Sequence, residues 1–294
     1  MGACILAKEE GREKAMKIIK KKTSKNKPIL LREFAGLKDL TTFIESTAPD
    51  EGWSDNHASD DFAFNPRWCG ARSYTEAKVS LQKGANVQEI KKAVTRGAGV
   101  TEKKKRTMDI IGGAPNVPAY LAGSPACMYR IDRVKSRGAY NVFVDVGVHC
   151  GVKKSEVCDA GIEILLRVLR LASNYPVNLY VGDLSKYDEK IYGHAVKIMD
   201  AGRPYNTARV SYALTEVGFL RVFGLAVIER NNGFWSASAQ YGYGRPLHSD
   251  ERKDAVNVVF KNAILVSTLE VVNHDVDAFK AIDAVLNEGR KHRK

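Results

Sequence analysis

The sequence has no apolar stretch long enough to cross a membrane, because no run reaches the roughly 18 consecutive apolar residues that a spanning helix needs. Residues 1–11 also lack the basic segment followed by an apolar segment that marks an export signal. Residue 6 is Leu, where an N-terminal myristoylation motif requires Ser or Thr. We therefore expect a cytoplasmic protein with no membrane partner.

Cysteines are few and form no pattern. The chain has five of them, an odd number with wide spacing, so neither a disulfide framework nor a paired zinc-binding motif is indicated. Cys150 follows His149, but one His-Cys step supplies only part of the closed ligand shell that zinc needs. We expect reduced thiols and no metal held by cysteine.

The common catalytic motifs are absent as well. The sequence contains no phosphate-binding Gly-x-x-x-x-Gly-Lys loop, no Gly-x-Ser-x-Gly elbow and no His-Glu-x-x-His pair. Gly242-Tyr-Gly-Arg has too few glycines for a dinucleotide-binding motif, and no spacing singles out a pair of carboxylates. We therefore expect a binding protein without a catalytic centre. A metal-dependent enzyme is the least favoured alternative.

Positive charge is abundant and unevenly distributed. The 46 Lys and Arg residues exceed the 34 Asp and Glu residues, which gives a formal net charge of +12. Basic residues concentrate in three stretches, at 12–27, 103–106 and 290–294. Such charge attracts phosphate polyanions or acidic partners, although solvated tails and linkers are equally basic in many soluble proteins.

The pattern along the chain divides it into four regions. Ser73 is expected to cap a helix that has Glu76 in its first turn and ends at Gly84, and a second helix is expected over 87–95. Residues 9–27 are expected to form a basic arm or helix, and 29–44 a short helical unit. The regions are 1–28, a basic arm; 29–106, a smaller, mainly helical region; 107–138, an irregular connector packed on the core; and 139–290, an α/β domain.

The C-terminal region alternates between strand and helix patterns. Such alternation predicts a mostly parallel sheet covered by helices on both faces. The second and third strands are close in sequence, which favours an antiparallel pair at the sheet edge. The expected strands are 141–148, 177–181, 194–199, 222–229 and 263–268, and the expected helices are 155–172, 208–217 and a terminal helix after residue 275.

Asp145 lies at the end of the first of these strands, in Val142-Phe-Val-Asp-Val-Gly-Val-His-Cys-Gly. A carboxylate at this position has to be solvated, hydrogen-bonded or bound to a metal, and capping of backbone amides is the simpler alternative. The segment resembles the von Willebrand factor A family, whose first strand ends in Asp-x-Ser-x-Ser. The resemblance implies a metal site that also takes Thr207 from Tyr205-Asn-Thr-Ala and Glu229 from Leu225-Ala-Val-Ile-Glu.

Two ligands of that implied site are missing, because Gly147 and His149 stand where the family has its serines. We therefore expect a degenerate site that binds Mg²⁺ weakly or not at all. Such a protein would act as an adaptor that binds another protein through its strand-end surface.

The whole chain resembles a family of uncharacterised tailed-bacteriophage proteins. The resemblance rests on Trp68-Cys-Gly-Ala-Arg-Ser-Tyr-Thr-Glu-Ala, Gly113-Ala-Pro-Asn-Val-Pro-Ala-Tyr-Leu-Ala-Gly-Ser-Pro-Ala-Cys-Met and Ala201-Gly-Arg-Pro-Tyr-Asn-Thr-Ala-Arg. It implies expression in an infected bacterium, where phage or host proteins would be the partners of an adaptor.

Nucleic-acid binding is the function that the sequence favours. Lysines would contact phosphates, and aromatic residues in the glycine-rich stretch 230–250 would stack on bases, unless they only anchor that stretch to the core. The candidate residues are Lys20, Lys21, Lys22, Lys103, Lys104, Lys105, Arg106, Trp235, Tyr241, Tyr243 and Arg245.

Overall fold

The computed structural model describes residues 16–50, 56–84, 106–109, 114–131, 138–187, 189–230 and 245–291. The chain divides into two compact units: Met1–Ile90 together with Ala139–Lys294 forms the first, and Lys91–Gly138 forms the second. The N-terminal residues that the sequence pattern separates from the α/β domain therefore fold with it.

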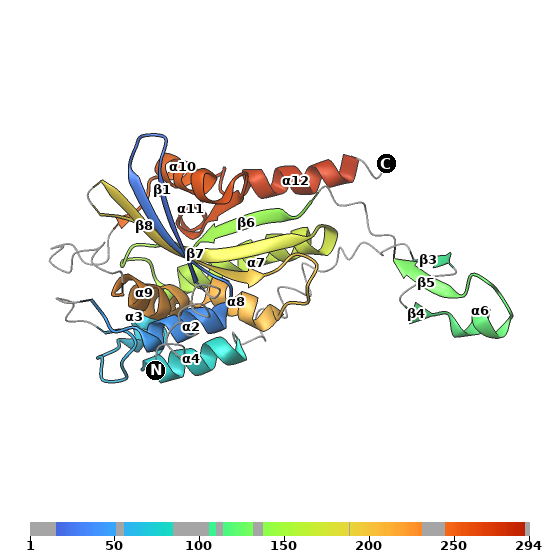
Figure 1. Ribbon diagram of the computed structural model, residues 1–294, viewed down its shortest axis with the longest axis horizontal. Helices are drawn as coiled ribbons and strands as arrows, with labels where there is room; N and C mark the ends of the chain where they lie inside the picture. Colours follow the sequence, from blue (N-terminus) through green and yellow to red (C-terminus); the bar gives the residue numbers. More distant parts are fainter. Residues whose placement is uncertain are drawn as a thin grey trace, which may run out of the picture. The chain divides into compact units, whose positions relative to one another are not determined.

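A mixed β-sheet runs through the first unit (Figure 1). In the part of the chain that the structure describes, its strands follow the order β1-β2-β8-β7-β6-β10, and the short β9 pairs with β7. The pairs β2/β8, β7/β6 and β6/β10 are parallel, whereas β1/β2, β8/β7 and β7/β9 are antiparallel, so the expectation of a mostly parallel sheet is wrong. The strands are β1 (Met16–Lys22), β2 (Pro28–Phe34), β6 (Tyr140–Asp145), β7 (Val177–Tyr187), β8 (Lys190–Met199), β9 (Arg245–Pro246) and β10 (Ile264–Ser267).

Helices accompany this sheet, which confirms the α/β class. Several begin or end within a few residues of the predicted bounds, among them the long helix α7 and the terminal helix α12. Ser73 caps α4 as predicted, since its hydroxyl accepts a hydrogen bond from the Glu76 amide at 3.1 Å. The helices are α2 (Leu37–Ser46), α3 (Pro66–Cys69), α4 (Tyr74–Lys83), α7 (Lys154–Asn174), α8 (Thr207–Thr215), the π-helix η2 (Phe219–Gly224), α9 (Leu225–Ile228), α10 (Ser249–Phe260), α11 (Thr268–Val272) and α12 (Lys280–Lys291).

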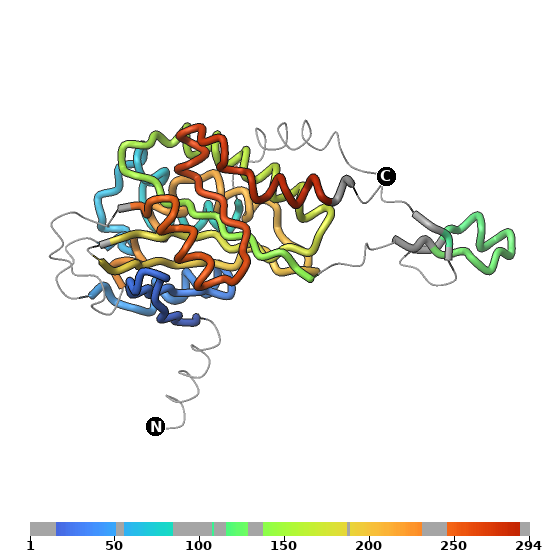
Figure 2. The backbone as a smooth tube through the Cα atoms, turned by 90° about the horizontal axis from the view of Figure 1, so that it is seen from above, coloured from blue at the N-terminus to red at the C-terminus, as the bar shows by residue number. Residues whose placement is uncertain are grey.

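The described residues of the predicted basic arm, 16–28, belong to the edge of the sheet. Strands β1 and β2 form a hairpin whose turn places Asn26 in the left-handed region, with φ at 64°. Strand β2 then pairs in parallel with β8, so β8 is internal and the expected sheet edge at 194–199 is wrong. Figure 2 shows this N-terminal segment in blue beside the yellow strands β7 and β8. Tertiary pairing of the apolar run Ile29-Leu-Leu overrides its helical spacing.

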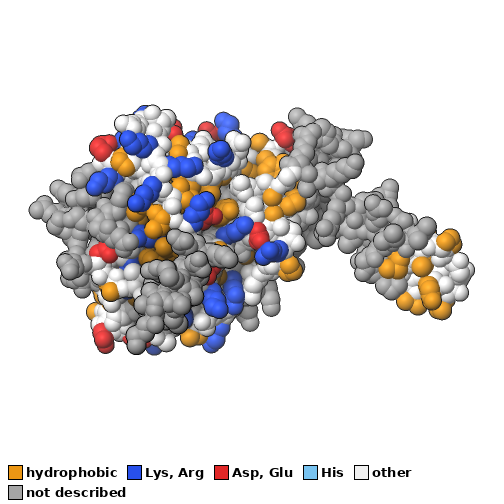
Figure 3. All heavy atoms as spheres, in the orientation of Figure 1, with side chains coloured by type: hydrophobic (Ala, Val, Ile, Leu, Met, Phe, Trp, Pro, Cys, Tyr) orange, Lys and Arg blue, Asp and Glu red, His pale blue; other side chains and the backbone are white. Residues whose placement is uncertain are grey.

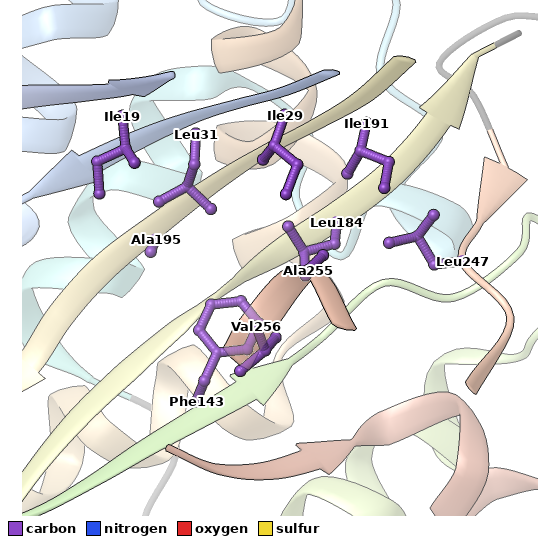
Figure 4. Close-up of a cluster of buried hydrophobic side chains, with 10 residues drawn as sticks. All are labelled: Ile19, Ile29, Leu31, Phe143, Leu184, Ile191, Ala195, Leu247, Ala255 and Val256. Atoms are coloured by element: carbon purple, nitrogen blue, oxygen red, sulfur yellow. The ribbon is translucent and has the colours of Figure 1, made fainter. Parts of the chain in front are cut away.

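One face of the sheet packs against α10. Ala255 and Val256 of this helix lie among buried aliphatic residues of β1, β2, β7 and β8, together with Phe143 of β6 (Figure 4). This contact joins N-terminal strands to a C-terminal helix, which explains why the two ends of the chain fold as one unit.

The other face packs against η2 and α9. The sequence predicted a strand over 222–229, and this is wrong, because residues from Phe219 to Ile228 are helical and buried. The Tyr192 hydroxyl of β8 donates to the Val227 carbonyl oxygen at 3.4 Å. A short apolar run that is buried all round has no periodicity that separates a strand from a helix, which accounts for the error.

No single helix among the described residues is long and apolar enough to span a membrane. The pair Thr207–Thr215 and Phe219–Ile228, which is bent by 75°, meets the length and composition requirements only when taken together.

The second unit contains a small antiparallel sheet with the strand order β3-β5-β4, and a short helix follows β4. The sequence predicted an irregular connector for these residues. The elements are β3 (Arg106–Asp109), β4 (Ala114–Pro115), α6 (Val117–Leu121) and β5 (Met128–Ile131).

Candidate functional site

Asp145 lies at the carboxyl end of β6, as predicted, but its charge is neutralised by an arginine. The Nε atom of Arg252, on α10, lies 2.6 Å from Asp145 Oδ2, and both side chains are almost completely buried. The Gly147 amide donates to Asp145 Oδ1 at 2.9 Å. The same arginine pairs with Glu270 Oε1 at 2.9 Å and donates to the Leu247 carbonyl oxygen at 2.7 Å. Arg252 therefore connects β6, α11 and the segment before α10.

A second carboxylate, that of Asp183 on β7, lies beside the first. A Cβ atom placed on Gly147 would contact the side chains of both Asp145 and Asp183, so glycine is required between them. The hydroxyl of Ser185 donates to Asp183 Oδ2 at 2.6 Å. Burial, and then the negative charge of Asp145, raise the pKa of Asp183 to about 7. Asp145 therefore forms the ion pair with Arg252, and Asp183 stays protonated at acidic pH.

These contacts differ from those of the metal site that the family resemblance implies. The guanidinium group of Arg252 already occupies the position next to Asp145 where a cation would bind. Gly147 offers only its amide, and His149 is exposed. Among the described residues, no group of three or more His, Cys, Asp or Glu side chains is placed to hold a metal ion.

Thr207 lies at the opposite edge of the sheet from Asp145. Strand β8 is antiparallel to β7 and ends at Met199, which pairs with Leu179 near the start of β7. Helix α8 then runs back, because Glu216 after its end pairs with Lys154 at the start of α7, at 3.5 Å. The exposed Thr207 begins α8 and is therefore distant from Asp145.

Glu229 does not end a strand but follows α9, where it belongs to a different buried cluster. Its carboxylate contacts His57 Nδ1 at 2.5 Å, accepts from the His57 amide at 3.0 Å and contacts Arg230 Nη1 at 3.2 Å. Arg230 also donates to the carbonyl oxygens of Ile44 and Thr47, at 2.9 and 2.7 Å. This cluster fastens the segment after α2 to α9. The structure therefore does not bring Asp145, Thr207 and Glu229 together as predicted.

His194 on β8 is a buried histidine that the sequence did not single out. Neither of its ring nitrogens has a hydrogen-bond partner among the described residues, and burial lowers its pKa to about 4. Gly224 of η2 faces the ring, since a Cβ atom there would lie 3.1 Å from His194 Cε1. The ring is therefore held neutral between the sheet and η2.

Five of the predicted nucleic-acid-binding residues lie among the described residues, and six lie outside them. Lys20, Lys21 and Lys22 are exposed on the edge strand β1, and Lys21 Nζ donates to the Val258 carbonyl oxygen at 2.7 Å. Exposed lysines on an edge strand also prevent it from pairing with another sheet. Arg106 and Arg245 belong to β3 and β9. The remaining candidates, Lys103, Lys104, Lys105, Trp235, Tyr241 and Tyr243, lie outside the described residues.

The second unit has a far more basic composition than the first. Between Lys91 and Gly138 the sequence has eleven Lys and Arg residues against three Asp and Glu residues, a net charge of +8. This leaves +4 of the total of +12 for the rest of the chain. The second unit is therefore the more positively charged of the two units.

Fold and site together define an α/β protein with a mixed sheet, an internal ion-pair cluster at its strand ends and a small basic second unit. The chain belongs to the family described as a domain of unknown function (DUF7192), whose model matches residues 16–288. This match spans both units. Among curated proteins no match was found, and no solved structure matches either.

Proposed function

We propose that the protein binds nucleic acid and that the second unit, Lys91–Gly138, provides most of the contacts to phosphates. The observation that carries this proposal is the net charge of +8 within one compact unit of 48 residues. Phosphate polyanions gain the most from such a charge density, because each neutralised phosphate releases condensed counterions. Lys103, Lys104, Lys105 and Arg106 are the densest run of basic residues in this unit.

The edge strand β1 is the second contact in this proposal. Lys20, Lys21 and Lys22 are exposed there, and Lys and Arg side chains are spread over the face of the first unit seen in Figure 3. Trp235, Tyr241 and Tyr243 remain the proposed base-stacking residues, with Arg245 beside them in the sequence.

We infer a binding role rather than a catalytic one for the first unit. Asp145 and Asp183 are buried and engaged with Arg252 and Ser185, so they do not face a substrate. We propose a von Willebrand factor A-like arrangement only for β6-α7-β7 with β10 beside β6, because residues 219–228 are helical and Thr207 is distant from Asp145. We propose that the nucleic acid is one present in an infected bacterial cell, which is what the resemblance to tailed-phage proteins implies.

Fluorescence anisotropy with labelled duplex DNA, single-stranded DNA and RNA, measured over a range of salt concentrations, tests this function. We expect binding at low salt, with the logarithm of affinity falling linearly with the logarithm of salt concentration. Lack of binding to all probes at low salt would eliminate the proposal. It would leave the alternative of a protein adaptor, for which a purified phage or host partner is the next test.

A further inference from the structure

Helix α6 in the second unit presents an apolar face to solvent. Val117, Tyr120 and Leu121 are 56%, 67% and 78% exposed, respectively. Their spacing of three and four residues places all three side chains on one side of the helix. Figure 3 shows hydrophobic side chains gathered on the described part of this unit.

The backbone that carries this face is well fixed. Asn116 caps the helix through a hydrogen bond from the Ala119 amide to its side-chain oxygen, at 3.2 Å, and its own amide donates to the Cys127 carbonyl oxygen at 2.7 Å. Pro118 lies in the first turn, and Gly123 adopts a left-handed conformation with φ at 72°. The apolar side chains are therefore presented from a short, capped turn tied to the segment before β5.

Among the residues of the second unit whose side-chain exposure the structure describes, which include all three residues of this face, none is buried. Exposed apolar groups that are close together in space usually mark a binding surface. The charge of the unit indicates the kind of partner, since a net charge of +8 is complementary to a polyanion.

We propose that Leu121 and Tyr120 insert between stacked base pairs when the second unit binds duplex DNA. This inference rests on the nucleic-acid-binding function proposed above and assigns a role to side chains that phosphate binding does not use. Basic proteins that kink DNA insert one or two apolar side chains at a base step while cationic residues hold the phosphates. Helix α6 has five residues. It is short for an amphipathic helix lying in a lipid surface, where many are about 20–30 residues long.

DNA bending is the direct test. A duplex of about 25 base pairs, with a donor and an acceptor dye at its ends, reports bending as increased energy transfer, and kinks of this kind are about 20–90°. We expect the full-length wild-type protein to increase the transfer at saturation and Leu121→Ala to reduce it towards the value of the free duplex. Affinity should fall about 5- to 150-fold for Tyr120→Ala, the range that corresponds to removal of one aromatic residue stacked on a base.

Three controls separate this inference from the function on which it rests. Leu121→Phe keeps a large apolar side chain and should retain bending, and Val276→Ala changes a residue of the first unit that is 96% exposed and should alter nothing. The salt dependence of Leu121→Ala should equal that of the wild type, because the variant keeps every basic side chain that neutralises a phosphate. Absence of binding by the wild type would contradict the proposed function itself.

Two results would overturn the wedge while leaving DNA binding intact. One is that Leu121→Ala does not lower the bending seen with the wild type at saturation, which includes the case in which the wild type binds without bending. The other is binding to phosphatidylserine vesicles, or self-association in sedimentation equilibrium, that Leu121→Ala abolishes while DNA bending is unchanged. Leu121 is mostly exposed, so the variant should fold normally, which circular dichroism checks.

Discussion

Replacing Arg252 by Met should destabilise the protein strongly, because it removes the cation that neutralises Asp145. The two side chains are only 2% and 0% exposed, and their charged atoms are 2.6 Å apart. Breaking such a buried pair costs about 3–5 kcal/mol, since the remaining charge has no compensation. Urea denaturation followed by circular dichroism measures the free energy of unfolding. A destabilisation below about 1 kcal/mol would refute the claim that Arg252 compensates Asp145.

A double-mutant cycle separates the ion pair from its surroundings. Asp145→Asn alone should also destabilise, whereas Asp145→Asn combined with Arg252→Met should cost less than the sum of the single changes. Lys197→Met is the matched control, because Lys197 pairs with Asp200 at 2.6 Å in a partly exposed position, where removal of the charge should cost about 1 kcal/mol or less.

Calorimetry with Mg²⁺ should show no tight one-site binding to the wild type. A tight isotherm abolished by Asp145→Ala would contradict the role assigned to Arg252.

Three further predictions concern buried groups. His194→Leu should make the free energy of unfolding less sensitive to acid. In the wild type the unfolded histidine gains its proton near pH 6.5 and the folded one near 4, so about 3 kcal/mol of stability is lost as pH falls through this window. Urea denaturation at several pH values measures this, and an unchanged pH profile in the variant would count against it. Asp183→Asn should change the pH dependence of stability in the opposite direction. The pKa of Asp183 is raised from 3.8 to about 7 in the folded protein, so the wild type loses about 4 kcal/mol of stability as pH rises through this window. The variant lacks this loss and should become more stable than the wild type as pH rises, which the same assay measures. Gly161→Ala should lower the melting temperature, because its Cβ would contact the Leu214 carbonyl oxygen where α7 meets α8, at a cost of about 1–3 kcal/mol; an unchanged melting temperature in calorimetry would refute this.

Elements with clear periodicity could be predicted from the sequence. Helix α7 and strands β6 and β10 lie near their predicted bounds, because a long amphipathic pattern or an apolar run flanked by turns identifies each of them. Strand β7 begins at the predicted residue but runs six residues further than predicted. The predictions for the hairpin β1-β2 and for the helical segment from Phe219 to Ile228 are wrong. Their structure is decided by partners that are distant in sequence: β8 for the hairpin, and the packed face of the sheet for the helix.

The candidate site was predictable only in part. Asp145 is recognisable because it ends a buried strand, and Asp183 carries the same signal in Val181-Gly-Asp-Leu-Ser, where it follows an apolar run. Arg252 gives no local signal, since it lies among other charged residues at the start of α10. Its pairing with Asp145 depends on tertiary structure that brings α10 to the end of β6.

The central claim is that the basic second unit carries nucleic-acid binding, and the salt dependence of charge-reversal variants tests it most directly. Lys103→Glu, Lys104→Glu and Lys105→Glu together should weaken duplex DNA binding and reduce the salt slope by about 0.9 for each phosphate that is no longer neutralised, close to 3 in total. The matched triple reversal of Lys20, Lys21 and Lys22 on β1 should reduce the slope by less. An unchanged slope in the first variant, or a larger reduction in the second, would contradict the claim.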